Sequence, residues 1–251
     1  MSPTGPYSVD RDSVVVLFKG GRLPAWQDVP PADRDRYEQE HVDLMLAVGR
    51  EHGLMGIEGF RLITAQGPWQ RYWVIEFPAL EGAEAWIDAE MRPPYGAYGF
   101  YEYELARRHA REELSSWPSR SRPEVTPLAA DPHQRATLSV RTDSIVILLF
   151  GRWRPEAEMV PADVRGDDDH VDLMRAVART HGLMRIDAYR LLAPKSDYHR
   201  AWVIEFPTLA DAEAWLEAEV LPPHGRYSDK RYLLARPWAP EYFATWPATR
   251  R

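Results

Sequence analysis

The sequence contains one domain-sized segment twice. Residues 41–62 read HVDLMLAVGREHGLMGIEGFRL, and residues 170–191 read HVDLMRAVARTHGLMRIDAYRL. The offset of 129 holds without a gap over residues 41–107, where about 37 of 67 positions are identical. Identity at this level indicates a recent duplication. The chain is therefore expected to fold as two copies of one unit.

The repeat continues upstream, where DSVVVLF at residues 12–18 matches DSIVILL at residues 143–149. Between the copies lies a stretch rich in Pro, Ser and Ala without sustained apolar periodicity, which is typical of a linker. We therefore predict a first repeat over residues 1–118, a linker over 119–141 and a second repeat over 142–251.

Each copy alternates strand and helix patterns in the order βαββαβ. An apolar run precedes a helix that ends at Gly53 or Gly182, and a hairpin, a second helix and a last strand follow. This order predicts a ferredoxin-like fold, in which both helices cover one face of a four-stranded antiparallel sheet. The other face must also be covered. We expect the two sheets to pack into an α+β barrel, within a monomer or through a homodimer.

Composition narrows the chemistry. The net charge of −7 and pI of about 5.7 give no basic face for nucleic acid. No apolar run is long enough to span a membrane, and the start of the chain lacks a secretory signal, so we expect no membrane partner and a cytoplasmic location. The absence of cysteine excludes thiolate chemistry and disulfides. Zinc, phosphate-loop and serine-hydrolase motifs are also missing, so we predict neither metal nor cofactor.

The hairpin suggests a polar site on the open face of each sheet. Strict alternation puts Phe60, Leu62, Trp73, Ile75 and Phe77 on the helix-facing side. If the loop centres near residues 68 and 69, Arg61 lies opposite Glu76, and Arg190 lies opposite Glu205. These four residues are candidates for substrate binding. The alternative is that both ion pairs only cover the sheet.

Two histidines are candidates for general acid–base catalysis. His41 and His170 are expected to open the first helix of each copy and to begin its buried stripe. There, burial and the carboxylate of Glu76 or Glu205 could bring the pKa of the imidazole close to neutral pH. The alternative is a histidine that packs against the core.

Differences between the copies suggest that one site works differently from the other. Tyr72 is replaced by Ala201, and Tyr95 by His224. Tyr95 and His224 follow a Pro-Pro pair at the end of the second helix, and Tyr98 and Tyr227 come three residues later. A tyrosine there could donate a hydrogen bond to a developing oxyanion, although one that only packs is the commoner case. We count Tyr72 and Tyr95 as candidate binding residues, and Tyr98, Tyr227 and His224 as candidate catalytic residues.

The element order, unit length and tandem arrangement resemble the dimeric α+β barrel superfamily. YEQEHVDLM around His41 is similar to the Tyr-Trp-x-x-His-x-Pro-Leu segment of the EthD-like branch, with Asp43 where that proline stands. WVIEFPTLADAEAW resembles the DUF1330-like branch. The resemblance implies a catalytic histidine at the position of His41 or His170. Some members of the superfamily bind haem through one histidine.

These observations favour a cofactor-independent enzyme that abstracts a proton next to a carbonyl of a small aromatic or polyketide-like substrate. Dehydration, cyclisation or isomerisation would follow. Two other possibilities remain at this stage. One is a protein that binds such a molecule without chemistry, and the other is an oxygenase, either haem-dependent or cofactor-free.

Overall fold

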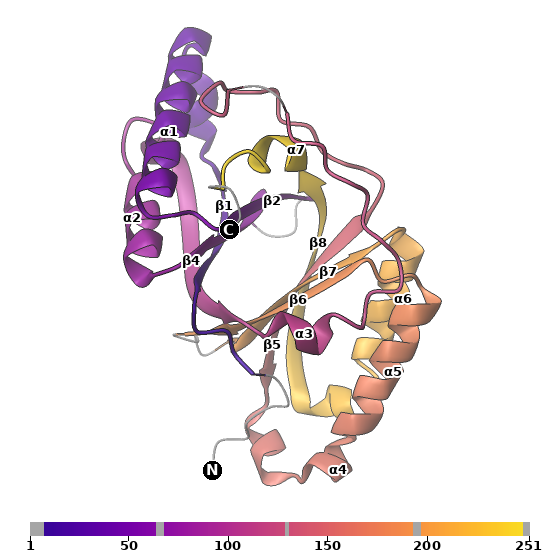
Figure 1. Ribbon diagram of the computed structural model, residues 1–251. Helices are drawn as coiled ribbons and strands as arrows, with labels where there is room; N and C mark the ends of the chain where they lie inside the picture. Colours follow the sequence, from indigo (N-terminus) through magenta and orange to yellow (C-terminus); the bar gives the residue numbers. More distant parts are fainter. Residues whose placement is uncertain (1–7, 64–67, 129–130, 193–196, 248–251) are drawn as a thin grey trace. The chain divides into compact units, whose positions relative to one another are not determined.

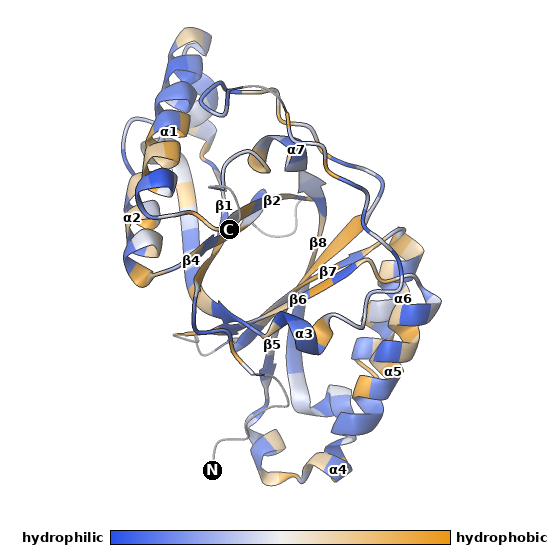
Figure 2. Cartoon of the chain, in the orientation of Figure 1, coloured by the Kyte–Doolittle hydropathy of each residue, from blue (hydrophilic) through white to orange (hydrophobic). Residues whose placement is uncertain are grey.

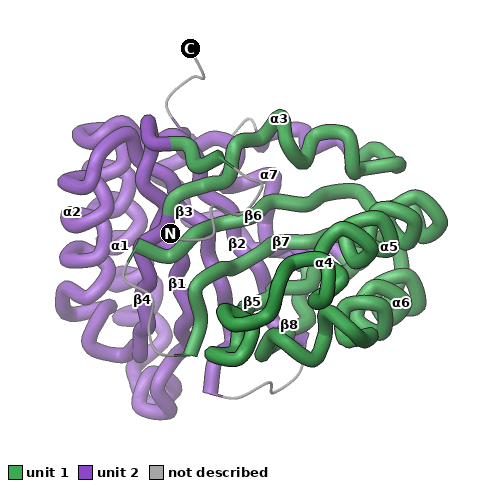
Figure 3. The backbone as a smooth tube through the Cα atoms, turned by 90° about the horizontal axis from the view of Figure 1, so that it is seen from below, with its two compact units in different colours: residues 1–10, 107–123, 142–236 green, residues 11–106, 124–141, 237–251 purple. Residues whose placement is uncertain are grey.

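The computed structural model describes residues 8–63, 68–128, 131–192 and 197–247. The chain forms two compact units (Figure 3). Unit 1 is residues 1–10, 107–123 and 142–236, and unit 2 is residues 11–106, 124–141 and 237–251. Part of the N-terminal stretch on which the expectation of no secretory signal rests lies outside the described residues.

Unit 2 is built around the first repeat. Its strands pair antiparallel in the order β4-β1-β3-β2, and both long helices pack on one face of the sheet (Figure 1). In chain order the elements are β1 (Val14–Arg22), the 3-10 helix η1 (Pro24–Asp28), α1 (Pro31–Glu51), β2 (Gly56–Leu62), β3 (Arg71–Phe77), α2 (Leu80–Glu90), η2 (Gly96–Tyr98) and β4 (Gly99–Arg108).

Unit 1 repeats this arrangement with the second copy, its strands pairing antiparallel in the order β8-β5-β7-β6. The elements are β5 (Ile145–Trp153), η3 (Pro155–Met159), α4 (Ala162–Arg165), α5 (Asp167–Thr180), β6 (Arg185–Leu191), β7 (Arg200–Phe206), α6 (Leu209–Glu219), η4 (His224–Tyr227) and β8 (Ser228–Trp238). The prediction of two tandem ferredoxin-like repeats is confirmed. The packing of the sheets into a barrel stays a prediction.

The first helix begins earlier than the sequence suggested. Because α1 starts at Pro31, His41 lies in the middle of the helix and does not open it. Proline suits the first helical turn, and ion pairs from Arg36 to Asp33 and Glu40 support the polar residues that follow. In the second copy Gly166, at φ 68°, separates α4 from α5, so His170 does lie near a helix start.

The core of unit 2 lies between the sheet and the helices. Figure 2 shows hydrophobic and hydrophilic residues side by side along α1 and α2, as expected of helices with one buried face. The buried side chains from the two helices include Met45, Leu46 and Trp86. They meet Phe18, Ile75 and Phe77 from the strands. The part of the helix-facing side that these residues cover is therefore apolar.

The segments that follow the last strand of each repeat are exchanged. Residues 107–123, with the short helix α3 (Arg111–Leu114), belong to unit 1, and residues 237–251, with α7 (Pro240–Phe243), belong to unit 2. Trp117 packs against Trp215, and Trp246 packs against Trp86, with ring centroids 6.4 Å apart in both pairs. Each repeat thus supplies an aromatic tail to the other. The predicted boundaries at residues 118 and 142 describe the sequence repeats and stay a prediction.

The hairpin register differs from the prediction. Arg61 lies opposite Arg71, and Arg190 lies opposite Arg200, so neither pairs with the predicted glutamate. Phe60 lies opposite Tyr72, which puts it on the face away from Trp73. The hairpin is centred two to three residues earlier than assumed. Because side chains alternate between the two faces, this change of register moves every side chain of one strand to the face opposite the predicted one.

Candidate functional site

Unit 2 contains a cavity of about 110 Å³ that is partly open to solvent. It lies over the helix-facing side of the sheet, where its wall includes residues of α1, α2 and the exchanged tail. Aromatic side chains form much of that wall: Phe18, Trp73, Trp86, Tyr95, Tyr101, Trp238, Tyr242, Phe243 and Trp246. The predicted sites were placed on the other face of the sheet, so this location was not foreseen.

Two close contacts shape the wall of the cavity. At Gly20 a Cβ atom would lie 2.6 Å from the ring of Phe18 and 2.7 Å from the carbonyl oxygen of Phe100, so a larger residue would need the wall to move. The tail packs edge-on against the sheet, because the ring of Trp73 meets that of Phe243 at 88° with centroids 4.8 Å apart. Aromatic packing of this kind gives a stiff wall.

His41 contacts Glu90, the last residue of α2, at the cavity. His41 Nε2 lies 3.2 Å from Glu90 Oε2, and both side chains are largely buried. The imidazole also stacks on Tyr95, with ring centroids 4.1 Å apart. Burial alone would raise the pKa of Glu90, but His41 and the guanidinium groups of Arg22 and Arg71 outweigh it and lower that pKa. The carboxylate is therefore ionised.

Two arginines also line the cavity. The guanidinium of Arg22 lies 3.5 Å from the ring centroid of Tyr95, and its Nη1 donates to the backbone oxygen of that residue at 3.4 Å. Arg71 lies 4.5 Å from the ring centroid of Trp238. Burial, aided by the charges of Arg22 and Arg61, lowers the pKa of Arg71 to about 10. Both guanidinium groups face aromatic rings.

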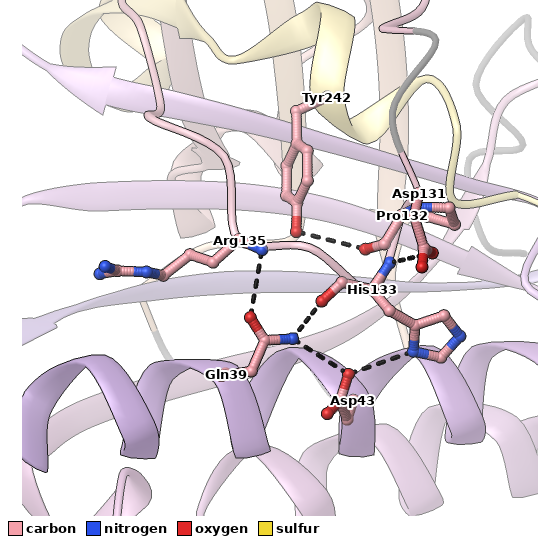
Figure 4. Close-up of polar contacts among 7 residues, drawn as sticks. All are labelled: Gln39, Asp43, Asp131, Pro132, His133, Arg135 and Tyr242. Carbon is pink, nitrogen blue, oxygen red and sulfur yellow. Dashed lines mark hydrogen bonds and ion pairs between the residues drawn. The ribbon is translucent and has the colours of Figure 1, made fainter.

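Part of the predicted linker is hydrogen-bonded to α1 (Figure 4). The Gln39 amide donates to Asp43 at 3.2 Å and to the backbone oxygen of His133, and the backbone N–H of Arg135 donates back to Gln39 at 3.2 Å. The Tyr242 hydroxyl donates to the backbone oxygen of Pro132 at 3.4 Å. The linker and the tail are therefore hydrogen-bonded to each other. Arg135 from the linker and Tyr242 from the tail both line the cavity.

The second repeat keeps the histidine–glutamate pair but changes its surroundings. His170 Nε2 lies 2.9 Å from Glu219 Oε2, and Lys230, at the position of Tyr101, lies 3.2 Å from the other carboxylate oxygen. His224, at the position of Tyr95, stacks on His170 with centroids 3.6 Å apart. Burial, followed by the charges of His170 and Lys230, lowers the pKa of His224 to about 3. His224 is therefore neutral at physiological pH.

The remaining predicted site residues lie elsewhere. Glu76 accepts a hydrogen bond from Ser13 at 2.7 Å. Glu205 accepts one from Ser144 at 2.6 Å and pairs with Arg122 at 2.8 Å, while Arg61 and Arg190 are exposed. Glu76 or Glu205 was expected to influence the histidine of its repeat, whereas the carboxylates that contact His41 and His170 are those of Glu90 and Glu219.

Of the predicted tyrosines, only Tyr95 is part of the cavity wall in unit 2. Tyr98 packs on Trp26 and Tyr37, with centroids 5.4 and 6.5 Å away. Tyr72 is buried beside Phe60, on the face of the sheet opposite the cavity. Tyr227 ends η4 in unit 1, where its backbone oxygen accepts from the Arg154 N–H at 2.8 Å.

Sequence reasoning missed Glu90, Glu219, Arg22 and Arg71. The glutamates had a signal, because AEAWIDAE and AEAWLEAE end in the same residue in both copies. The exchanged tails had a signal too, the Trp-Pro pairs at residues 117–118 and 246–247. Within the described residues, no helix is long and apolar enough to cross a membrane. In that same part of the chain, no cluster of three or more histidine or acidic side chains could hold a metal ion.

Comparison with known proteins establishes the fold. No protein-family profile matches the chain, and no curated protein matches it by sequence. Among solved structures, it is similar to a single-residue variant of chlorite dismutase from Candidatus Nitrospira defluvii, with a TM-score of 0.66 and 11% identity over 90% of this chain and 91% of that one. A double variant of the same enzyme gives 0.65 and 12% over 95% and 97%. Its complex with imidazole gives 0.63 and 11% over 90% and 91%.

Proposed function

We propose that the cavity of unit 2 binds a small aromatic molecule and that His41 moves a proton at a carbon next to a carbonyl of that molecule. The observation that carries the proposal is the buried pair of His41 and Glu90 at a cavity walled by aromatic side chains. The volume of about 110 Å³ approaches the ~150 Å³ of a dry cavity that holds benzene, and because the cavity is partly open a ligand can extend beyond it.

The pair suits general base chemistry. If Glu90 accepts the Nε2 proton, Nδ1 of His41 keeps its lone pair and is the basic nitrogen. In the proposed step, Nδ1 takes the proton, the electron pair of the C–H bond forms a C=C bond, and the π pair of the carbonyl moves onto its oxygen to give an enolate. The guanidinium charges of Arg22 and Arg71 favour that negative oxygen. Delivery of that proton from His41 to a different carbon of the enolate completes an isomerisation. Expulsion of a β-hydroxyl group, which takes the proton from His41 and leaves as water, completes a dehydration. Attack of the enolate carbon on a second carbonyl of the same molecule, whose oxygen takes the proton from His41, completes a cyclisation.

This proposal keeps the lyase, cyclase or isomerase class and the EthD-like assignment as its finer expectations. It places the reaction in the first repeat, because the aromatic cavity adjoins His41. Tyr98, Tyr227 and His224 stay candidate catalytic residues by prediction only. Arg61, Arg190, Glu76, Glu205 and Tyr72 stay candidate binding residues in the same sense.

Haem chemistry is the main alternative, because the chain shares its fold with chlorite dismutase. An axial histidine must turn a ring nitrogen toward space wide enough for a porphyrin. A carboxylate on Nε2 leaves Nδ1 for a ligand, but the ring of His41 stacks on Tyr95 and that of His170 stacks on His224, at centroid distances of 4.1 and 3.6 Å. The cavity at His41, close in volume to a benzene-sized space, is much smaller than a porphyrin. The residues as placed do not fit haem.

The proposal is tested with phenylpyruvate in deuterium oxide, a probe with an aromatic ring and an acidic C–H next to its carbonyl. Loss of the C3 proton signal by NMR reports proton transfer. We expect exchange above the buffer rate with the native chain, its loss in His41→Ala, and its retention in His170→Ala, the matched change in the other repeat. Ligand binding without exchange in the native chain would point to a binding protein, and exchange that survives His41→Ala would contradict the assignment. Consumption of dissolved oxygen together with loss of phenylpyruvate would favour the oxygenase alternative.

A further inference from the structure

Arg71 carries a charge that the described part of the chain does not neutralise at close range. Its Nε atom is buried without a hydrogen-bond partner among the described residues, and its guanidinium lies against the ring of Trp238. A buried donor left unpaired costs ~1–3 kcal/mol, and more when it is charged. Such a group is tolerated where a ligand completes it.

Positive charges near Arg71 add to the free-energy cost of burying its guanidinium. Arg61 lies directly opposite across the hairpin, and like charges in that position destabilise a sheet. Arg22 adds a second positive charge, and both lower the pKa of Arg71. The pKa of about 10 still leaves Arg71 charged at neutral pH.

The acidic groups around the cavity are already engaged. Glu90 pairs with His41, and Glu38 pairs with Arg135, which also holds Asp35 at 2.6 Å. Glu38 and Glu90 act on the pKa of Arg71 more weakly than Arg22 and Arg61 do. The cavity therefore has an excess of positive charge beside its aromatic wall.

We propose that Arg71, with Arg22 beside it, binds the carboxylate of a small aromatic acid whose ring lies among the tryptophans of the unit 2 cavity. A guanidinium presents paired N–H donors that match a carboxylate, and that of Arg71 lies over the ring of Trp238. This inference rests on the proposed function, because it names the class of molecule that the same cavity accepts.

The inference is tested by calorimetric titration of the full chain with benzoate, benzamide and inorganic phosphate. Benzamide keeps the ring and shape without the charge, and phosphate keeps a charge without the ring. We expect benzoate to bind at least roughly 10-fold more tightly than either, since a hydrogen bond to a charged group contributes ~1.5–3 kcal/mol. Benzamide binding as tightly as benzoate would overturn the inference and leave the aromatic cavity standing. Phosphate binding as tightly as benzoate would show a plain anion site and would also overturn it.

Variants separate a binding role from a structural one. Arg71→Met should weaken the binding of benzoate roughly 10- to 100-fold and leave the affinity for benzamide unchanged. It should also raise the melting temperature of the ligand-free protein, because it removes an unpaired buried charge. Arg71→Lys should restore part of the benzoate affinity. Arg200→Met changes the equivalent position of the second repeat and should leave benzoate binding unchanged.

Two results would contradict the assignment of Arg71. The first is equal weakening of benzoate and benzamide in Arg71→Met, which would mean that the residue only shapes the cavity. The second is a larger effect from Arg200→Met than from Arg71→Met, which would move the anion site to unit 1. If no aromatic probe binds the native chain, the inference and the proposed function fail together.

Discussion

The Nε2 atom of His41 lies 3.2 Å from Oε2 of Glu90 and so joins the middle of α1 to the end of α2. The same contact recurs 129 residues later between His170 and Glu219, at 2.9 Å. Around the first pair lie Tyr95 and an aromatic cavity, and around the second lie His224 and Lys230. The same histidine–glutamate contact therefore has different neighbouring side chains in the two repeats.

Glu90→Gln tests whether the carboxylate sets the protonation of His41. Glutamine keeps the size of the side chain but removes the negative charge that stabilises the imidazolium formed on proton abstraction. We expect the exchange rate of phenylpyruvate to fall at least roughly 10-fold, within the range that a positioned acid–base group contributes. Glu219→Gln is the matched control and should leave the rate unchanged. An unaltered rate in Glu90→Gln would show that the carboxylate only anchors the helices.

Acid should destabilise the chain partly through His224. Its pKa is lowered to about 3, against 6.5 for an ordinary histidine, so between these values the unfolded state binds a proton that the folded state does not. Stability should therefore fall as the pH drops through this window, by at most about 1.4 kcal/mol per pH unit. Partial exposure of the ring reduces that figure.

His224→Tyr checks this pH dependence with the residue that the first repeat uses. Urea denaturation between pH 4 and 7.5 should give a shallower loss of stability in the variant than in the native chain. Some slope should persist, because burial, with Arg200 nearby, lowers the pKa of His109 to about 4. Identical slopes in the two proteins would refute the role given to His224.

The exchanged tail should be needed for both stability and binding in unit 2. Trp246 is 8% exposed, packs on Trp86 and lines the cavity. Trp246→Ala should lower the free energy of unfolding by ~3 kcal/mol and weaken benzoate binding. Trp117→Ala removes the equivalent contact in unit 1 and should destabilise by a similar amount while benzoate binding persists. Equal loss of binding in both variants would speak against a cavity confined to unit 2.

Added haemin should produce no stoichiometric Soret band. The expectation follows from the stacking of His41 on Tyr95 and of His170 on His224 and from the small volume of the unit 2 cavity. Titration of the purified chain followed by absorption spectroscopy measures it. A sharp one-to-one band that disappears in His170→Ala or His41→Ala would require a haem site and would overturn this reading.

Much of the fold follows from local pattern, whereas the site depends on tertiary register. Apolar periodicity and the repeat predict the order βαββαβ, since these signals lie within single elements. The partner of Arg61 depends on where the hairpin turns. The prediction misplaced that turn, so it assigned the side chains of the strand to the wrong faces of the sheet. The partner of His41 lies 49 residues away at the end of another helix, which helix periodicity alone does not predict.

The exchange of tails was equally out of reach. The Trp-Pro pairs at residues 117–118 and 246–247 mark equivalent tails, but nothing local in them says which repeat each tail packs on. That choice is set by the path of the chain after β4 and β8. Because Trp238, Tyr242 and Trp246 come from the second tail, the cavity of the first repeat is built in part from residues far away in sequence.

The most direct test of the central claim is a crystal structure with 4-bromobenzoate, in which anomalous scattering locates the bromine atom. We predict one strong bromine peak within the aromatic wall of the unit 2 cavity, with the carboxylate directed at Arg71 and the ring within reach of His41. A peak beside His170 in unit 1, or a ligand in the unit 2 cavity whose carboxylate points away from Arg71, would contradict the account.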